Sequence, residues 1–432
     1  MRKVLIISPD VIGHQMAGPG IRYWQIAEQL SKDFQVTLMT PNECPRKHER
    51  LSVLTFRRSV LKKLHNTFDS ILVQGMTLSR NRFLKKSRAT IIVDLYDPFV
   101  FETINLRKKD LHFSLDLDYM FEQIHAGDYF ICSSERQRDM YIGMLTALKR
   151  VDLEYFQNDK NLSKLIGVVP FGLQSESPIK KALNPFLKYS NIKDTDKVFI
   201  WGGGIWQWLD PLTLIRAFHL LSEERDDVKL FFLGVKHPNS HIEQSEMTVR
   251  AITLAEQLGI KGTVVFFEEW TPYDERINYL VHSYAGVCGH FDSLETRFSF
   301  RTRMLDYILC ELPIITTDGD YFAELVKKEY CGLVVKENDV LGFKNAINQM
   351  LNNPSEYERY KSNLKSIKEG FLWEKTTRDL REHCLHPTKL KTKGKISLVI
   401  KMNVKFFVVN AKRILKGKGL RKAIELIKNR LH

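Results

Sequence analysis

Short apolar runs recur along the chain and constrain its fold more than any other feature. The first is Val4–Ile7, and similar runs follow at Gln35–Met39, Ser70–Val73, Thr90–Asp94 and Tyr129–Glu135, the last of which runs into a helix. Runs of this length and character are typical of parallel strands that are buried on both faces. Longer segments with helical character separate them. The first half of the chain is therefore predicted to form a doubly wound parallel sheet with helices on both faces.

The same pattern starts again in the second half of the chain. A strand at Val198–Trp201 runs into the glycine turn Gly202–Gly204, and Asp210-Pro211 is a good helix start, with a capping carboxylate and proline at the first helical position. Further strands are predicted at Lys229–Gly234, Thr263–Phe267, Ala285–Cys288 and Ile314–Thr317. We therefore expect an α/β protein with two Rossmann-like domains, and two such domains that face each other form a cleft for a small molecule.

The expected domain boundaries follow from these strands and from shifts in composition. The first domain is expected at residues 1–175 and the second at 197–355, joined by a polar, proline-containing linker at 176–196. Helices at 356–386 should return to the first domain, and a basic tail should occupy 387–432. Two domains are also the default for a chain of 432 residues.

Nearly all of the net charge belongs to the tail. Between His386 and His432 there are eleven lysines, three arginines and one glutamate, a net charge of +13 out of +14 for the whole chain. One face of a predicted last helix is apolar and lies opposite basic residues; it consists of Leu420, Ile424, Ile427 and Leu431. This pattern favours an interfacial helix on an anionic membrane. A core-docked helix for 397–410 and a disordered basic tail are the alternatives, and few aromatic residues are present to stack on nucleic acid.

The cysteines and the N-terminal residues indicate the cellular compartment in which the protein is expected. The six cysteines are scattered without a CxxC pair, which argues against a zinc site and a disulfide framework and fits a reducing cytosol. The apolar run after Met1 is too short for a signal peptide, and no uninterrupted apolar run is long enough to cross a membrane. We expect a protein on the cytoplasmic side of the plasma membrane, held there peripherally.

Residues 293–306 carry the strongest binding signal. The carboxylates Glu295 and Asp306 bracket the arginines Arg297, Arg301 and Arg303, just before and within the start of a predicted helix. A helix N-terminus attracts anions, and arginine matches the geometry of phosphate oxygens. A carboxylate in the first turn would instead accept hydrogen bonds from ribose hydroxyls. This combination points to a nucleoside diphosphate, and the alternative is an ordinary salt-bridged helix start.

Two further clusters in the first half lie where ligands bind in parallel sheets. Gly18 and Gly20 follow the first strand and resemble a phosphate-approaching glycine loop, although the G-x-G-x-x-G pattern is incomplete and a plain turn is the alternative. Asp94 and Asp97 follow the Thr90 strand at its carboxyl end. Asp97 would equally serve as a helix cap before Pro98. Ser134 is a predicted cap of the next helix, and Glu135 is either functional or a first-turn acid.

Several segments together resemble the family 4 glycosyltransferases, which have the GT-B fold and retain anomeric configuration. The resemblance rests, in order, on residues 17–22, 94–97, 134–135 and 169–172 in the first half and on 201–215, 232–238, 267–273 and 294–306 in the second. It covers roughly residues 1–380. Each segment alone is a weak match, whereas their order and spacing make the match fairly specific.

The resemblance implies a role for each matching residue. Gly18 and Gly20 would approach the donor diphosphate or the acceptor, Gly202, Gly203 and Gly204 would line the cleft, and Trp270 and Thr271 would meet the nucleotide base. Glu295 would lie near the donor sugar and Asp306 on the ribose. These two are eleven positions apart, whereas the family has two glutamates eight apart. Arg301 and Arg303 are chosen for the diphosphate on electrostatic grounds, because the family's usual arginine and lysine have no match.

On the acceptor side the resemblance points to Arg22, Asp94 and Glu135, with Asp97 beside the acceptor as a candidate catalytic residue together with Glu295. It implies no metal and no cofactor beyond the nucleotide-sugar substrate. The predicted function is transfer of a sugar from a nucleotide diphosphate-sugar to a lipid-linked or growing glycan of a cell-envelope polysaccharide, such as lipopolysaccharide or capsule. A nucleotide-sugar epimerase and a non-catalytic membrane-tethered binding subunit are the alternatives.

Overall fold

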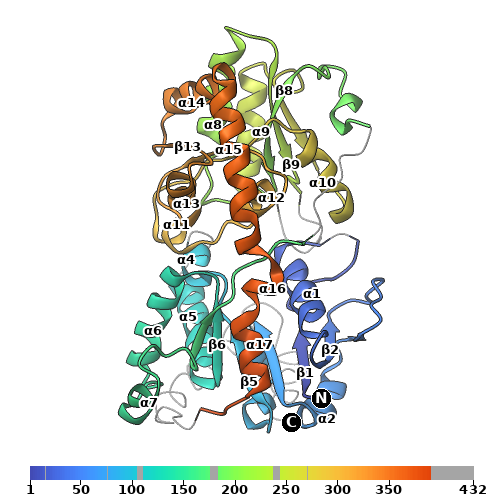
Figure 1. The fold of residues 1–432 in the computed structure, drawn as a ribbon, viewed down its shortest axis with the longest axis vertical. Coiled ribbons are helices and arrows are strands. Elements are labelled where there is room, and N and C mark those ends of the chain that lie inside the picture. The colour runs from blue at the N-terminus through green and yellow to red at the C-terminus, as the bar shows by residue number, and fades with distance from the viewer. Residues whose placement is uncertain are drawn as a thin grey trace, which may run out of the picture.

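Two parallel sheets, one above the other along the long axis, organise the molecule (Figure 1). This computed structural model describes residues 1–14, 16–74, 76–104, 110–175, 183–236, 244–269 and 271–390. We call the parts of the chain built on the two sheets the first and second domains. The arrangement confirms the predicted fold class, an α/β protein with two Rossmann-like domains.

The first sheet has the strand order β3-β2-β1-β4-β5-β6-β7, and its paired strands all run parallel. Its strands are β1 (Lys3–Ile7), β2 (Gln35–Thr40), β3 (Leu51–Thr55), β4 (Ser70–Gln74), β5 (Thr90–Asp94), β6 (Tyr129–Cys132) and β7 (Ile166–Val168). The helices of this domain are α1 (Gly18–Leu30), α2 (Arg58–Leu64), η1 (His65–Thr67), α3 (Thr77–Arg80), η2 (Arg82–Lys86), α4 (Phe99–Ile104), α5 (Asp110–Ala126), α6 (Glu135–Ala147) and α7 (Leu153–Asn158).

The second sheet has the order β10-β9-β8-β11-β12-β13 and is also parallel. Its strands are β8 (Lys197–Gly202), β9 (Val228–Leu233), β10 (Val265–Glu268), β11 (Ala285–Cys288), β12 (Ile314–Thr317) and β13 (Gly332–Val335). Its helices are η3 (Pro185–Lys188), α8 (Pro211–Ser222), α9 (Glu246–Gln257), α10 (Tyr273–His282), α11 (Leu294–Phe298), α12 (Arg303–Leu309), α13 (Tyr321–Glu329) and α14 (Val340–Asn352).

Burial explains which strands the sequence revealed. Central strands such as β4 and β5 are buried at every position, so they read as continuous apolar runs. The edge strands β3 and β13 are only partly buried, and their sequences lack such a run. Sequence patterning therefore missed both of them. It also missed the edge strand β7, which is largely buried but only three residues long.

Two helix starts have the caps predicted for them, and one glycine loop differs from its prediction. The Asp210 carboxylate accepts a hydrogen bond from the Thr213 N–H at 3.1 Å, and the Ser134 hydroxyl accepts one from the Gln137 N–H at 3.2 Å. Gly18 and Gly20, in contrast, lie within the first turn of α1 rather than in a loop before it. The chain turns into the helix earlier than expected because proline at residue 19 occupies one of the first helical positions.

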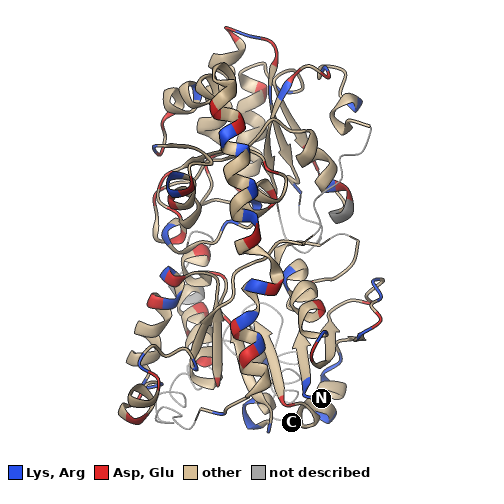
Figure 2. Ribbon diagram, viewed as in Figure 1, with Lys and Arg blue, Asp and Glu red and all other residues tan. Residues whose placement is uncertain are grey.

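The C-terminal segment joins the two domains. α15 (Pro354–Ile367) packs on the second domain, and η4 (Lys368–Phe371), α16 (Trp373–Thr376) and α17 (Arg378–Leu385) continue onto the first (Figure 1). His383 of α17 stacks on Tyr129 with ring centroids 4.0 Å apart, and Arg381 forms an ion pair with Asp33 at 2.7 Å. Both basic and acidic residues occur along this segment (Figure 2).

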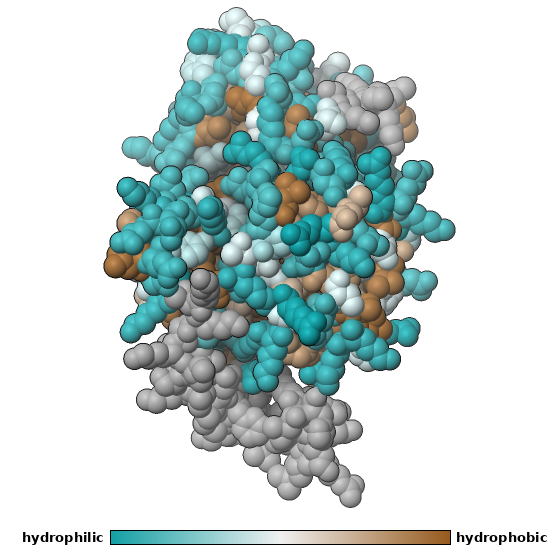
Figure 3. Space-filling model, turned by 60° about the horizontal axis from the view of Figure 1, so that its bottom comes forward, coloured by the Kyte–Doolittle hydropathy of each residue, from teal (hydrophilic) through white to brown (hydrophobic). Residues whose placement is uncertain are grey.

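Two predictions concern the membrane: an amphipathic helix in the C-terminal tail, and the lack of a membrane-spanning segment. Residues 391–432, which hold the predicted amphipathic helix, lie outside the described residues. Within the described part of the chain, no helix is both long and apolar enough to span a bilayer. The face in Figure 3 is predominantly hydrophilic where it is described, with hydrophobic residues in small separate groups.

Candidate active site

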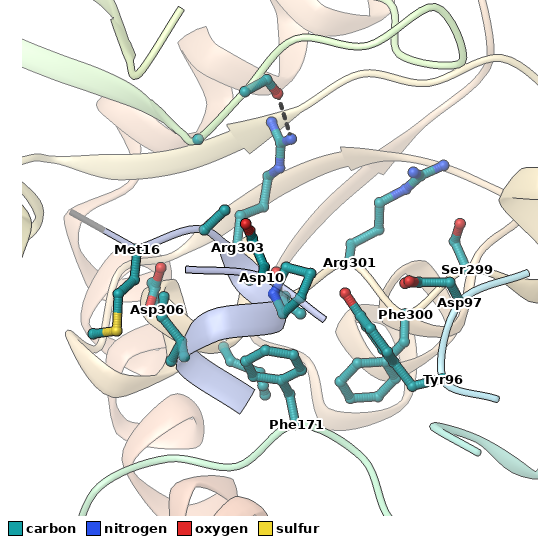
Figure 4. Close-up of a pocket in the computed structure, with 18 of the residues that line it drawn as sticks. Asp10, Met16, Tyr96, Asp97, Phe171, Ser299, Phe300, Arg301, Arg303 and Asp306 are labelled. Carbon is teal, nitrogen blue, oxygen red and sulfur yellow. Dashed lines mark hydrogen bonds between the residues drawn. The ribbon is translucent and has the colours of Figure 1, made fainter. Parts of the chain in front are cut away.

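A cavity of about 1140 Å³ lies between the carboxyl ends of the two sheets and is lined by residues of both domains. Figure 4 shows part of its lining, with Tyr96 and Asp97 from the first domain facing Arg301, Arg303 and Asp306 from the second. Its size is ample for a small-molecule substrate. Of the residues singled out from sequence, the lining includes Gly18, Asp94, Asp97, Gly202, Gly203, Gly204, Thr271, Glu295, Arg301, Arg303 and Asp306.

The glycine turn after β8 forms one wall and is fixed by a buried tyrosine. The Tyr307 hydroxyl accepts a hydrogen bond from the Gly202 N–H at 2.8 Å and lies 3.0 Å from the carbonyls of Ile200 and Val287. Gly203 has φ = +127°, a conformation that residues with a side chain rarely adopt. The turn therefore brings bare backbone to the cavity, as a site that approaches an anion closely requires.

Arg303 is the arginine placed to meet a ligand. Its Nη2 donates to the Gly204 carbonyl at 2.7 Å, and its guanidinium lies 4.7 Å from the centre of the Trp201 ring. Its Nη1 is buried and has no hydrogen-bond partner among the described residues. A buried unpaired guanidinium N–H is costly, so this atom is poised to donate to an anionic ligand in the cavity.

Arg301, the other arginine predicted to hold phosphate, is occupied by carboxylates. Its Nη1 and Nη2 donate to the two oxygens of Glu295 at 2.9 and 2.8 Å, and its Nε lies 3.7 Å from an oxygen of Asp320. The Ser299 hydroxyl also donates to Glu295. Arg301 thus orients the Glu295 carboxylate, and both side chains are buried.

Two further titratable residues beside the Arg301–Glu295 pair, Asp320 and His290, are also buried. Burial raises the pKa of Asp320 to about 6, against the opposing effect of Arg301. His290 lies 3.6 Å from Asp320 through its Nε2, and burial lowers the pKa of His290 well below its ordinary value. His290 is therefore neutral near pH 7.

Asp306 also has a cationic partner. Its carboxylate accepts a hydrogen bond from Nη2 of Arg276, on α10, at 2.9 Å. Burial raises the pKa of Asp306, while Arg276 and Arg303 act in the opposite direction. Thr271, at the start of the segment that leads into α10, also lines the cavity. Trp270 lies outside the described residues.

On the first domain a buried ion pair supports the opposite wall. Arg22 donates to the two oxygens of Asp94 at 2.7 and 3.0 Å and to the Val169 carbonyl at 2.8 Å. Neither side chain of the pair is exposed to solvent. Burial raises the pKa of Asp94 and outweighs the effect of Arg22. Arg22 does not line the cavity, whereas its partner Asp94 does, so Arg22 holds Asp94 from behind the cavity wall.

Asp97 faces the cavity from the loop after β5. Its carboxylate accepts a hydrogen bond from the Gln74 amide at 3.0 Å. Burial, together with the nearby Asp94, raises the pKa of Asp97 to about 7. Burial and repulsion from Asp97 and Glu295 raise the pKa of Glu102, on α4, well above its ordinary value. A carboxyl with a pKa near 7 is suited to exchange a proton at neutral pH.

Two sequence-predicted residues lie away from the cavity. Gly20 packs against the preceding loop, where an added Cβ would lie 2.4 Å from the Val11 carbonyl oxygen, so glycine serves close packing there. The Glu135 side chain is 75% exposed and lies 3.8 Å from Arg138. Neither residue is part of the cavity lining.

Sequence reasoning did not find Arg276, Glu102, Trp206 or Trp208, all of which line the cavity. Trp206 and Trp208 stack in parallel with centroids 5.7 Å apart. In the sequence they follow a glycine turn and lie within segment 201–215 of the family resemblance, but neither signal gave them a role. Among the described residues, no group of three or more His, Cys, Asp or Glu side chains could hold a metal ion.

Comparisons with known proteins agree with this geometry. Residues 186–366 match the family model described as glycosyl transferases group 1. A search of curated proteins returned no match.

Solved structures share the fold over most of the chain. Sucrose-phosphate synthase from Thermosynechococcus elongatus has a TM-score of 0.65 at 14% identity, covering 89% of this chain and 98% of its own. WaaG, a glycosyltransferase involved in lipopolysaccharide biosynthesis, has a TM-score of 0.61 at 13% identity, covering 89% and 100%. Anabaena Alr3699/HepE in complex with UDP-glucose has a TM-score of 0.60 at 13% identity, covering 88% and 99%.

The family match covers the whole wall that holds Gly202–Gly204, Arg303 and Asp306, and the two-domain fold extends the likeness to the opposite wall. The second half of the chain thus matches the group 1 glycosyltransferases, and the chain as a whole shares its two-domain fold with WaaG and the other solved structures.

Proposed function

We propose that this enzyme transfers a sugar from a UDP-sugar to a lipid-linked or growing glycan acceptor during synthesis of a cell-envelope polysaccharide. Three fold relatives support the choice of donor: HepE was solved with UDP-glucose, an Escherichia coli trehalose-6-phosphate protein with UDP-2-fluoro glucose, and a pneumococcal O-GlcNAc transferase with UDP and GlcNAc. WaaG, which acts in lipopolysaccharide biosynthesis, supports the class of acceptor.

The observation that carries the proposal is the pairing of one available cation with bare backbone on the second-domain wall. Nη1 of Arg303 lacks a partner among the described residues, and its Nη2 is anchored on the Gly204 carbonyl of the glycine turn. A diphosphate at this turn would meet the guanidinium and would lie close to the backbone, because the three glycines carry no side chains. The N–H groups of Gly202 and Gly203 already donate within the protein, so the guanidinium is the donor that the proposal rests on. The Asp306 carboxylate would accept hydrogen bonds from the ribose hydroxyls, and Thr271 would lie toward the base.

The same placement suggests how the leaving group is stabilised. Charge develops on the diphosphate as the bond from the sugar breaks, and preorganised donors in a dry cavity lower the energy of that state. Arg303 is preorganised by its bond to Gly204 and its contact with Trp201. Glu295, fixed by Arg301, would lie beside the donor sugar, and Asp97 would face the acceptor hydroxyl from the other wall.

We further propose that the second domain holds the donor and the first domain the acceptor. Asp97 and Glu102 belong to the first domain, whereas Arg303, Asp306 and Thr271 belong to the second. The basic tail 387–432 would hold the enzyme on the anionic cytoplasmic face of the plasma membrane, where a lipid-linked acceptor is presented.

Nucleotide-induced thermal stabilisation tests the donor site. The full-length protein is heated with UDP, GDP, ADP and CMP and with their sugars, alongside Asp306→Ala. A ligand at 100 times its Kd adds about 2.7 kcal/mol to stability. We expect stabilisation by uridine nucleotides, lost in Asp306→Ala. Stabilisation by another base would refute the choice of UDP, and no response to any nucleotide would refute the donor site.

Turnover separates transfer from the alternative activity of an epimerase. The enzyme is incubated with the stabilising nucleotide sugar, with and without a membrane extract that supplies lipid-linked glycans. We expect release of the nucleoside diphosphate and a labelled lipid product only when the extract is present. Conversion of the sugar without release of the nucleotide would instead identify an epimerase.

A further inference from the structure

One buried glutamine joins the two walls of the active site. Gln137 lies in the first turn of α6 and is completely buried. Its Oε1 accepts a hydrogen bond from the Ser133 N–H at 2.8 Å. Its Nε2 donates to the Tyr96 carbonyl at 2.8 Å and to the Phe298 carbonyl at 2.7 Å. All the hydrogen-bonding capacity of this amide N–H₂ group is therefore spent on two backbone carbonyls, one in each domain.

Each of those carbonyls is adjacent to a candidate catalytic carboxylate. Tyr96 directly precedes Asp97 in the loop after β5. Phe298 is the last residue of α11, the five-residue helix whose first turn holds Glu295. The next residue, Ser299, donates its hydroxyl proton to Glu295. The Gln137 amide thus connects the backbone of Asp97 with the short helix of Glu295.

Other contacts around Gln137 also join the first domain to α11. The ring of Phe298 stacks on that of Phe101, with centroids 5.7 Å apart and planes 15° from parallel. Arg136, next to Gln137, donates to the carbonyls of Arg297 at 3.3 Å and Gly319 at 3.1 Å and forms an ion pair with Glu324. Among the described residues, Arg136 donates no hydrogen bond to the loop that carries Asp97, whereas Gln137 does.

We infer that Gln137 is a positioning residue that sets the distance between Asp97 and Glu295 across the cleft. This inference rests on the proposed function, because it requires both carboxylates to act on one donor–acceptor pair. Groups that converge from two domains must be held within a fraction of an ångström, and a misplacement of about 1 Å costs about 100-fold in rate. Arg303, Asp306 and Thr271, which the proposed function assigns to the nucleotide, all lie in the second domain, so nucleotide affinity should not depend on this amide.

The test compares Gln137→Met and Gln137→Glu with the wild-type enzyme. Methionine keeps the length and volume but loses every hydrogen bond, whereas glutamate keeps the acceptor for Ser133 and presents a carboxylate to the two carbonyls. We expect kcat for sugar transfer to fall about 100-fold in both variants. The Kd for UDP, measured by calorimetry, should stay within about twofold. A twofold change in Kd corresponds to a free energy much smaller than that of one lost contact with the nucleotide. Arg136→Met is the matched control, with a loss below about fivefold expected because it leaves the Gln137 bridge intact.

Two results would overturn the inference. One is a kcat within threefold of wild type in Gln137→Met. The other is a loss of UDP affinity that equals the loss of kcat, which would mean general damage to the fold. Thermal unfolding of each variant is measured in parallel. If one of the two Gln137 variants is unfolded at the assay temperature, the comparison with wild type uses the other.

The distance between the two domains tests the interdomain hydrogen bonds of Gln137 without an activity assay. Spin labels are placed on the full-length protein at Leu153→Cys and Leu341→Cys, two exposed positions in the first and second domains. The half-buried Cys44 and Cys310 are changed to serine. We expect Gln137→Met to broaden the interdomain distance distribution, and an unchanged distribution would contradict the bridge. If the wild type neither binds UDP nor transfers sugar, the proposed function fails, and this measurement still decides whether Gln137 joins the domains.

Discussion

At the scale of the residue, the active site separates two arginines that look equivalent in the sequence. Arg301 and Arg303 are two positions apart, yet Arg301 lies against Glu295 and Asp320, whereas Arg303 keeps one donor without a partner among the described residues. The difference arises because Arg301 precedes α12 and turns toward α11, while Arg303 begins α12 and reaches the glycine turn. One arginine therefore organises the protein and the other is available to substrate.

Substituting each of these arginines should produce a different defect. Arg303→Ala should weaken UDP binding by about 1.5–3 kcal/mol, the worth of a charged hydrogen bond, with little loss of stability. Arg301→Ala should instead destabilise the fold by about 3–5 kcal/mol, because it leaves buried carboxylates without their partner. Calorimetric titration with UDP and urea denaturation measure the two effects. An Arg301→Ala variant that is as stable as wild type but binds UDP poorly would reverse the assignment.

Asp97 should make stability depend on pH. Its pKa of about 7 in the folded protein lies above the ordinary value, so the folded state binds this proton more tightly than the unfolded chain does. The resulting contribution to stability is complete below about pH 4 and is lost as the pH rises through 7. Asp97→Asn should therefore gain stability relative to wild type between pH 4 and 8, by an amount on the order of 3 kcal/mol. Urea denaturation at several pH values measures it, and a difference that does not change with pH would contradict the raised pKa.

At the scale of the element, a single hydroxyl ties α12 to the strands that form the cavity floor. Tyr307 reaches β8 through Gly202 and Ile200 and reaches β11 through Val287. This contact sets the position of the glycine turn relative to the helix that carries Arg303 and Asp306. The site is therefore assembled by the packing of elements and not by one local motif.

Tyr307→Phe should destabilise the protein by about 1–3 kcal/mol, because the Gly202 N–H loses its buried partner. The same change should weaken UDP binding by displacing the glycine turn. Tyr23→Phe is the matched control: Tyr23 is also fully buried, but its hydroxyl has no hydrogen-bond partner among the described residues, so its removal should be neutral or stabilising. Urea denaturation compares the two variants, and equal losses would show that the hydrogen bonds of Tyr307 contribute nothing specific.

At the scale of the whole molecule, two stretches of chain pass between the domains side by side. Leu173 accepts a hydrogen bond from the Trp373 N–H at 3.0 Å and donates one to the Phe371 carbonyl at 2.7 Å. Trp373 also packs against Phe171 with ring centroids 5.4 Å apart. The paired segments at Leu173 and Trp373, together with the hydrogen bonds of Gln137, connect the two domains beside the cleft. These contacts fix the position of one cleft wall relative to the other.

The basic tail should bind the whole enzyme to anionic membranes. Each lysine or arginine near such a surface contributes about 1 kcal/mol, so binding should fall steeply as salt is raised. We expect the full-length protein, but not a chain ending at residue 390, to sediment with vesicles containing anionic lipid. Replacing Leu420, Ile424 and Ile427 by serine keeps the charge and should weaken binding if the apolar face inserts. Equal binding of the shortened chain would place the membrane contact elsewhere.

Local patterning in the sequence was enough to predict the two parallel sheets, most of their strands and two of the helix caps. These features depend on short-range periodicity and on residues within one turn, so a single sequence records them. The concentration of charge in residues 387–432 was likewise visible from composition alone. The edge strands β3 and β13 escaped because partial burial leaves no continuous apolar run.

Only the tertiary structure decided which polar residues meet. Arg276 pairs with Asp306 across 30 positions, Arg22 with Asp94 across 72, and Gln137 with Phe298 across 161. Such pairs have no local signature, because each partner is chosen by the packing of elements that are distant in the chain. For the same reason the sequence showed that residues 293–306 carry charge suited to a nucleotide, but the fold alone determined that Arg301 serves Glu295 and that Arg303 faces the cavity.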